Sequence, residues 1–201
     1  MAVFQVADLI TDVLELLGEV DANGNNDYTY FSENFLKRKL LESYKSVAKD
    51  SLSVFTIEDI NGITGKAYLE STDYTPLMVS FLSEGGSVLS ERVDKSPSNL
   101  NDGEYCLYNG RIYIEPAPTD SDVYTLNYIG YKKYTASSTS IELDDSLKEA
   151  LLNKMLFFCS VFDGKADMAA MYDNLYKGDI KKNKKFKRNR LKYKWNPEFT
   201  E

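Results

Sequence analysis

Apolar side chains recur three and four residues apart in two segments near the start of the chain. This spacing predicts one amphipathic helix over residues 4–18, ended by Gly18, and a second over residues 32–50, capped by Ser32. A polar connection joins the two segments. The apolar positions are Val6, Leu9, Ile10, Val13, Leu14, Leu16 and Leu17 in the first helix and Phe35, Leu36, Leu40, Tyr44 and Val47 in the second.

The pattern changes between residues 52 and 131, where short runs of Val, Thr, Ile and Tyr are separated by Gly, Pro, Asn and Asp. Such runs predict β-strands joined by turns. Asn109-Gly110 lies between two alternating runs and predicts a type I′ hairpin, because both central residues of that turn need positive φ. The candidate strands are 53–58, 66–70, 77–82, 87–93, 104–108, 111–115 and 122–130.

Helical periodicity returns after a polar loop at residues 132–144. Ser146 and Glu149 have the spacing of a capping box, in which the side chains of the two residues bond each other's backbone N–H groups. They predict the start of a strongly apolar helix over residues 145–163. Gly164 follows it and is placed to end it.

A fourth helix is predicted over residues 165–177, ended by Gly178. Amphipathic helices must bury their apolar stripes, so we expect the two N-terminal and two C-terminal helices to pack together. The predicted fold class is therefore α+β: a helical bundle core with a β-rich insertion at about 52–131. We expect a single domain over residues 1–178 and a basic C-terminal arm over residues 179–201.

The composition of this 201-residue chain limits which catalytic and metal-binding functions it can have, because the chain contains no histidine. That removes the commonest general base and a usual zinc ligand. Cys106 and Cys159 fall in a predicted strand and a predicted helix, and we interpret both as small buried apolar residues. No apolar stretch reaches the length of about 20 residues that spans a membrane. We therefore expect no enzyme activity, no catalytic residue, no metal or organic cofactor and no membrane partner.

Charge is divided unevenly along the chain, whose formal net charge is −7. Residues 1–176 hold 28 acidic and 14 basic residues, whereas residues 177–194 hold 10 basic residues and one acid, Asp179. An acidic body thus carries a short basic segment. Asymmetry of this kind concerns partners more than fold.

The basic arm interleaves lysine and arginine with aromatic residues, and three interpretations are open. It is a solvated tail, an arm that docks on an acidic protein surface such as a neighbouring subunit, or a direct contact to nucleic acid. Residues 191–195 also alternate with period two, which would allow them to extend and pair with a strand edge. The candidate partner-binding residues are Lys181, Lys182, Lys184, Lys185, Phe186, Lys187, Arg188, Arg190, Leu191, Tyr193 and Trp195.

A second candidate surface lies on the first predicted helix. Asp8, Asp12, Glu15 and Glu19 recur three and four residues apart, opposite the apolar positions. This acidic stripe is either a solvated helix face or a surface that meets a basic partner. The basic arm of a neighbouring copy is one such partner.

Several segments of the chain together match a known layout. The opening helix reads Ala-Asp-Leu-Ile-Thr-Asp-Val-Leu-Glu-Leu-Leu-Gly (7–18), and a second amphipathic helix and a β-rich middle follow. Further segments are Arg-Ile-Tyr-Ile-Glu-Pro-Ala-Pro (111–118), Leu-Asn-Tyr-Ile-Gly-Tyr (126–131), Ile-Glu-Leu-Asp-Asp-Ser-Leu-Lys-Glu-Ala-Leu-Leu (141–152) and the turn Gly-Lys-Ala-Asp (164–167). In this order they resemble the head-to-tail connector, or adaptor, proteins of tailed bacteriophages, including the gatekeeper-type tail rings of short-tailed phages. The Lys- and Tyr-rich composition would suit a phage of the crAss-like kind.

The resemblance implies a structural virion protein and no enzyme. It implies a ring, commonly of about twelve copies, that sits at the head–tail junction beneath the portal protein. Such a ring binds tail or nozzle proteins and leaves a channel for genomic DNA. The resemblance also implies that the protein is made in the cytoplasm of the host bacterium. The alternative is a stand-alone nucleic-acid-binding module that acts through the basic tail.

Overall fold

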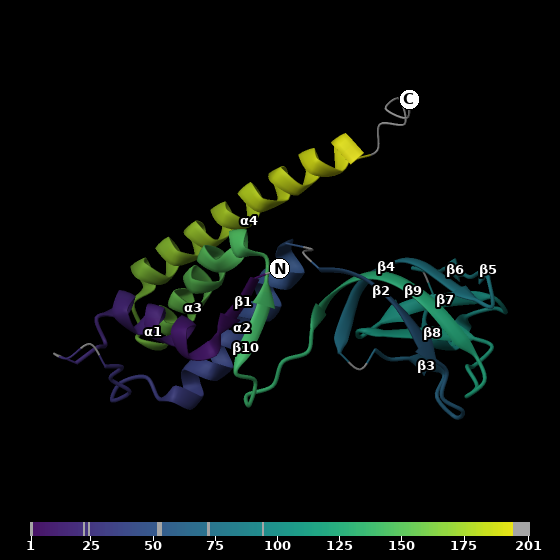
Figure 1. Cartoon of the computed structure of the whole chain (residues 1–201), viewed down its shortest axis with the longest axis horizontal. Coiled ribbons are helices and arrows are strands. Elements are labelled where there is room, and N and C mark those ends of the chain that lie inside the picture. The colour runs from purple at the N-terminus through teal and green to yellow at the C-terminus, as the bar shows by residue number, and fades with distance from the viewer. Residues whose placement is uncertain are drawn as a thin grey trace. The chain divides into compact units, whose positions relative to one another are not determined.

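The computed structural model describes residues 2–21, 23, 25–51, 54–71, 73–93 and 95–194. The chain divides into two compact units (Figure 1). The helical unit comprises residues 1–51 and 134–201, and the strand unit comprises residues 52–133. The fold is therefore of the mixed α+β class, as predicted, and the strand unit is inserted between two stretches of the helical unit.

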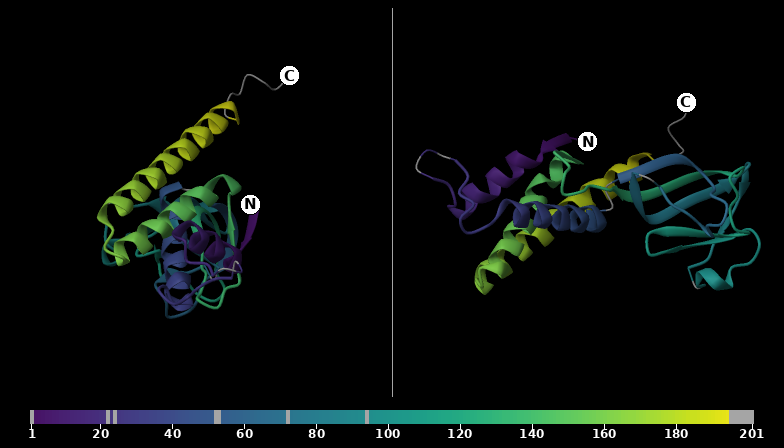
Figure 2. Two further views of the ribbon diagram at one scale, coloured as in Figure 1. Left: turned by 90° about the vertical axis from the view of Figure 1, so that its left-hand side faces the viewer. Right: turned by 90° about the horizontal axis from the view of Figure 1, so that it is seen from below.

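The described part of the helical unit contains four α-helices and one two-stranded sheet. Helix α3 packs against α1, α2 and α4, and it lies between α1 and α4 (Figures 1 and 2). Seven residues of α3 are buried, which explains why its sequence is so apolar. The elements are β1 (Ala2–Gln5), α1 (Val6–Leu17), α2 (Glu33–Ser51), β10 (Ser140–Leu143), the 3₁₀ turn η2 (Asp145–Leu147), α3 (Lys148–Phe162) and α4 (Ala166–Lys194).

Local capping signals set the predicted ends of the first two helices. Gly18 has φ +76° and its N–H binds the carbonyl oxygens of Glu15 and Leu14, so it ends α1 as predicted. The Ser32 hydroxyl accepts a hydrogen bond from the backbone N–H of Phe35 at 3.3 Å, which confirms it as the cap of α2. In both cases the interaction spans only a few residues, so the sequence was sufficient to find it.

The start of α3 differs from the prediction. The carboxylate of Asp144 caps the turn before α3: it accepts from the backbone N–H and the hydroxyl of Ser146 at 3.1 and 2.7 Å, and no side chain caps α3 itself. Residues Asp145–Leu147 then form η2, and α3 begins at Lys148. The predicted capping box is wrong, because Ser146 lies inside η2 and both its N–H and its hydroxyl donate to Asp144.

Strands β1 and β10 were not predicted. We expected helix from residue 4 and a polar loop over 132–144, but residues 2–5 pair antiparallel with residues 140–143. Ile141 and Leu143 are fully buried, so one face of this two-stranded sheet faces the core. Each strand has only four residues, too few for a clear alternation, and its partner is far away in the sequence.

Helix α4 runs from Ala166 to Lys194 and passes through Gly178, where we expected it to end. Glycine in a helix interior costs about 1 kcal/mol relative to alanine. Buried residues on both sides of it, Tyr176 and Ile180, hold the helix in place. The alternation of residues 191–195 would have allowed an extended strand, but residues 191–194 belong to the same helix, and Trp195 lies outside the described residues.

Two four-stranded sheets build the strand unit. The first has the order β2-β9-β4-β5 and the second β3-β8-β7-β6, with antiparallel pairs except for β6 and β7. Their buried side chains, among them Leu82, Ile112 and Leu126, join in one apolar core. The strands are β2 (Val54–Asn61), β3 (Tyr68–Leu69), β4 (Tyr74–Glu84), β5 (Ser87–Val88), β6 (Ser90–Glu91), β7 (Glu104–Tyr108), β8 (Arg111–Glu115) and β9 (Val123–Lys132), with a 3₁₀ turn η1 (Pro97–Asn99).

The hairpin between β7 and β8 is confirmed. Asn109 has φ +51° and Gly110 has φ +73°, as a type I′ turn requires, and Tyr108 pairs with Arg111 across it. The predicted strand at 87–93 instead becomes β5 and β6, which belong to different sheets. Leu89 lies between them and is buried, so the chain changes sheet at a core residue.

Candidate interaction surface on helix α4

The inner side of α4 joins it to the other helices. The amide of Asn153 on α3 donates to Asp179 at 3.0 Å, and the amide of Asn183 donates to the Ser146 hydroxyl in η2. Ile180, between these two contacts in the sequence, is 7% exposed. The helix is therefore packed as far as Asn183, five residues beyond Gly178.

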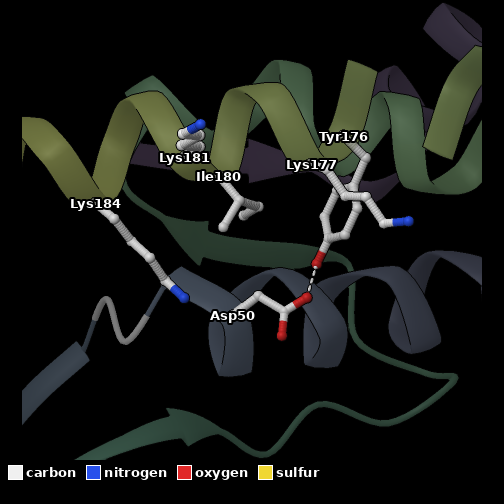
Figure 3. Close-up of a pocket in the computed structure, with 6 residues that line it drawn as sticks. All are labelled: Asp50, Tyr176, Lys177, Ile180, Lys181 and Lys184. Carbon is white, nitrogen blue, oxygen red and sulfur yellow. Dashed lines mark hydrogen bonds between the residues drawn. The ribbon is translucent and has the colours of Figure 1, made fainter. Parts of the chain in front are cut away.

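A pocket of about 340 Å³ lies where α4 faces the end of α2 (Figure 3). The hydroxyl of Tyr176 donates a hydrogen bond to the carboxylate of Asp50, and the two side chains meet across the pocket. Asp50 is the acidic member of a lining that also contains Tyr176, Lys177, Ile180, Lys181 and Lys184. Three lysines against one carboxylate make this surface basic.

The three lysines differ in how they are paired. Lys177 binds Asp173 at 2.5 Å, and this hydrogen bond lowers the pKa of the Asp173 carboxyl. Lys181 and Lys184 are exposed, and neither has an ion-pair or hydrogen-bond partner among the described residues. Burial, together with the hydrogen bond to Asp50, raises the pKa of Tyr176 above its ordinary value, so its hydroxyl stays protonated. The unpaired lysines are the part of the pocket that is free to bind an anionic group.

Only part of the predicted basic arm can be located through its side chains. Lys181 and Lys184 line the pocket, whereas Lys182 points to Asp179, 3.4 Å away. Trp195 lies outside the described residues. Seven predicted residues occupy helical backbone in the last turns of α4: Lys185, Phe186, Lys187, Arg188, Arg190, Leu191 and Tyr193.

The acidic stripe occupies α1 and the residues just after it. Asp8 and Glu15 are exposed, and Asp12 is half-buried and binds Lys148 at 2.9 Å. This hydrogen bond raises the pKa of Lys148. Glu19 lies beyond the end of α1, so the helical part of the stripe is Asp8, Asp12 and Glu15. The structure does not bring these carboxylates to the α4 pocket of the same chain.

Sequence reasoning missed Asp50 and the role of Tyr176. Asp50 stands in the last turn of α2 and Tyr176 in the middle of α4, so they meet only through the packing of these helices. No local pattern marks either residue. The lysines, in contrast, were visible as a charge run.

The cysteines have the predicted environment. Cys106 and Cys159 are both free and buried. Burial raises the pKa of Cys106 and raises that of Cys159 to about 12, so both remain protonated thiols. Among the residues that the structure describes, no group of three His, Cys, Asp or Glu side chains is arranged to hold a metal ion. None of the described helices is long and apolar enough to cross a membrane.

Together these features define a two-unit α+β protein with an exposed basic surface on its last helix. The model of the SU10 adaptor protein family matches residues 4–194. The chain belongs to this family, whose members are structural adaptor proteins of bacteriophages and are not enzymes. No curated protein sequence matches the chain. An adaptor associates with other virion proteins, such as those of the portal and the tail.

Proposed function

We propose that the chain forms a ring that connects the portal protein to the tail and leaves a channel for genomic DNA. The ring has about twelve copies, as the resemblance to phage connector proteins implies, and it closes through head-to-tail contacts. The observation that carries the proposal is the pair of unpaired lysines, Lys181 and Lys184, on an exposed helix of a phage adaptor. These lysines have no ion-pair or hydrogen-bond partner among the residues that the structure describes, so they are available to a partner.

The acidic composition of the body supports a channel role. Residues 1–176 hold 28 acidic and 14 basic residues. Carboxylates that line a channel repel the phosphates of the duplex, so DNA slides through without binding. The ring therefore needs no base-specific contacts.

The basic end of α4 acts as an assembly arm in this proposal. Positions 181–194 hold nine basic residues and no acid, and like charges three and four residues apart destabilise a helix. An acidic partner surface relieves that repulsion. Because exposed ion pairs contribute only about 0–1 kcal/mol each, the aromatic and apolar residues Phe186, Leu191, Tyr193 and Trp195 supply buried area in the assembly.

Assembly with the portal protein tests the proposal. The purified chain is mixed with the portal protein of the same phage, and the products are measured by light scattering after size exclusion and by negative-stain imaging. We expect closed rings attached to portals. A chain that stays monomeric both alone and with the portal would overturn the proposal.

The boundary of α4 packing defines the best truncation. Removing residues 185–201 deletes most of the basic arm and leaves the packed residues Tyr176, Ile180 and Asn183 in place. The truncated chain is expected to keep its folded body, checked by its near-ultraviolet circular dichroism, and to assemble more weakly. A deletion from residue 179 onward is a poor substitute, because it also removes buried contacts of α4.

The same nine basic residues favour a second candidate, direct binding of nucleic acid. Release of counterions would then make DNA affinity fall steeply as the salt concentration rises. A salt titration of DNA binding by the full chain and by the chain without residues 185–201 separates the two functions. If the truncated chain assembles normally but loses DNA binding, the arm is a nucleic-acid contact and its assembly role is wrong.

A further inference from the structure

Two helices of opposite charge lie on opposite sides of the helical unit. Helix α3 lies between α1 and α4 (Figures 1 and 2). The outer face of α1 is acidic, and the exposed face of α4 beside the Asp50 pocket is basic. A protein with two different complementary surfaces on opposite sides can associate head to tail, the arrangement that generates closed rings.

The spacing of the charges is the same on both helices. Asp8, Asp12 and Glu15 stand at positions i, i+4 and i+7 of α1. The pocket lysines Lys177, Lys181 and Lys184 stand at positions i, i+4 and i+7 of α4 (Figure 3). Seven residues of α-helix rise about 10 Å, so each row has the same length. Two helices packed side by side would bring the rows into register.

Both rows also contain charges that the chain leaves unpaired. Asp8 and Glu15 on one side, and Lys181 and Lys184 on the other, have no ion-pair partner within the described chain. Each row has one internally paired member, Asp12 with Lys148 and Lys177 with Asp173. The unpaired members are therefore two of each sign.

An apolar residue accompanies the acidic row. Leu16 follows Glu15 in the sequence and is 59% exposed. The pocket on α4 offers apolar side-chain surface from Ile180 and Tyr176 between its lysines. A leucine placed in this pocket would add the buried apolar area that surface ion pairs lack.

We propose that α1 of one copy docks on the basic face of α4 of the next copy, with the row of Asp8, Asp12 and Glu15 against the row of Lys177, Lys181 and Lys184 and with Leu16 in the pocket. This inference rests on the proposed ring, for which it names the surfaces between neighbouring subunits. A second copy is the occupant because the acidic row with matching spacing is present in every chain. Assembly through this contact weakens as salt rises, since exposed charges are screened.

Charge reversal tests the contact with a built-in rescue. One variant carries Asp8→Lys and Glu15→Lys, and the other carries Lys177→Glu and Lys184→Glu, so that the first and last positions of each row are reversed. Each alone places like charges together, and we expect the concentration at half-assembly to rise by roughly tenfold or more at low salt. An equimolar mixture of the two variants restores complementary contacts all round an alternating ring, and so does one chain that carries all four changes.

Two further variants control for fold and for charge. Lys45→Glu with Lys49→Glu reverses two exposed lysines on α2 and should leave assembly unchanged. Leu16→Ser removes the apolar contact without a change of charge and should weaken assembly by severalfold. Sedimentation velocity measures assembly, with portal added if the wild type needs it, and circular dichroism verifies that each variant is folded.

The outcomes separate this inference from the proposed ring function. If wild-type rings form and reversal on α1 leaves them intact, or if the mixture of reversed variants is not rescued, the inference is wrong and the ring stands. Loss of portal attachment by the α4 variant alone, with normal rings, would assign the lysines to the portal and also overturn the inference. If the wild type forms no ring with or without portal, the proposed function itself fails.

Discussion

The strand unit and the helical unit use their charged side chains in different ways. In the strand unit, the carboxylate of Glu104 accepts hydrogen bonds from Lys95 at 2.7 Å, from Arg92 at 2.8 Å and from the backbone N–H of Asn101 at 2.9 Å. In the helical unit, Lys181 and Lys184 lie on the surface of α4 and bind nothing in the described chain. One set of charges holds a loop to a strand, and the other has no ion-pair partner among the described residues.

This difference separates residues that build the fold from residues to which we assign a role in assembly. The hydrogen bond from Lys95, followed by that from Asn101, lowers the pKa of Glu104 to about 2, so the carboxylate is coupled to the folded state. Substitutions at such a site change stability. Substitutions at the exposed lysines of α4 should change assembly and leave the fold intact.

The largest effect should come from the core of the strand unit. Leu126 is fully buried, and Leu126→Ala removes buried methyl groups and leaves a cavity, at a cost of about 2–5 kcal/mol. Because the chain consists of two compact units, the loss should be concentrated in the strand unit. Hydrogen exchange in urea checks this: protection should fall in the strands more than in α3. Equal loss in both units would show that they unfold together.

The second-largest effect on stability should come from protonation of Glu104, the carboxylate that Lys95, Arg92 and Asn101 bind. The folded pKa of about 2 lies below the ordinary value of 4.5, so the stabilisation is complete above about pH 4.5 and is lost as pH falls toward 2. Glu104→Gln cannot ionise and should be less stable than the wild type at pH 7, by less than Leu126→Ala. Its stability should also depend less on pH between 4.5 and 2. Urea unfolding at several pH values measures both effects, and parallel pH profiles for the two proteins would contradict this account.

A smaller loss of stability is expected when the buried hydroxyl of Tyr176 in the helical unit is removed. Tyr176→Phe removes the hydrogen bond to Asp50 and should cost about 1 kcal/mol at pH 7. The pKa of Tyr176 is raised in the fold, so its stabilising contribution is present below about pH 10 and lost as pH rises further. Thermal unfolding at pH 7 and pH 11 tests both statements. A phenylalanine variant with the same alkaline loss as the wild type would assign that loss to other tyrosines.

Gly178→Ala should stabilise the protein. Gly178 lies inside α4 without a positive φ, and a Cβ there would meet no atom within 4 Å. Alanine in a helix interior is favoured over glycine by about 0.5–1 kcal/mol. The melting temperature should therefore rise. A fall would mean that the residue ends the helix in solution, as the sequence pattern alone had indicated.

The smallest effect on stability should come from the exposed lysines. Lys181→Glu with Lys184→Glu should change the free energy of unfolding by no more than about 0.5 kcal/mol, because neither side chain has a partner in the described chain. Urea unfolding of the unassembled variant measures this. A large destabilisation would place these lysines among the residues that build the fold, and the comparison of the two units would fail.

Local signals in the sequence were sufficient for several elements. Helices α1 and α2 were recognised from their apolar periodicity, from Gly18 and from Ser32, since each signal acts within a few residues. The hairpin at Asn109-Gly110 was recognised because few residues other than asparagine and glycine adopt positive φ easily. The basic run and the acidic stripe were also visible, because they are patterns of neighbouring residues. The order of segments that resembles phage adaptors could likewise be read from the sequence.

Other features depend on segments that are distant in the sequence. The pairing of β1 with β10, the division of the strands into two sheets and the hydrogen bond between Tyr176 and Asp50 all join such segments. Helix α4 continues past Gly178 because α2, α3 and η2 pack against it, and this packing offsets the weak helix propensity of glycine. The sequence by itself thus determined the helix-forming segments, the hairpin and the signs of the surface charge. Only the tertiary structure decided which segments meet and which lysines have no partner among the described residues, because those outcomes depend on contacts that no local pattern contains.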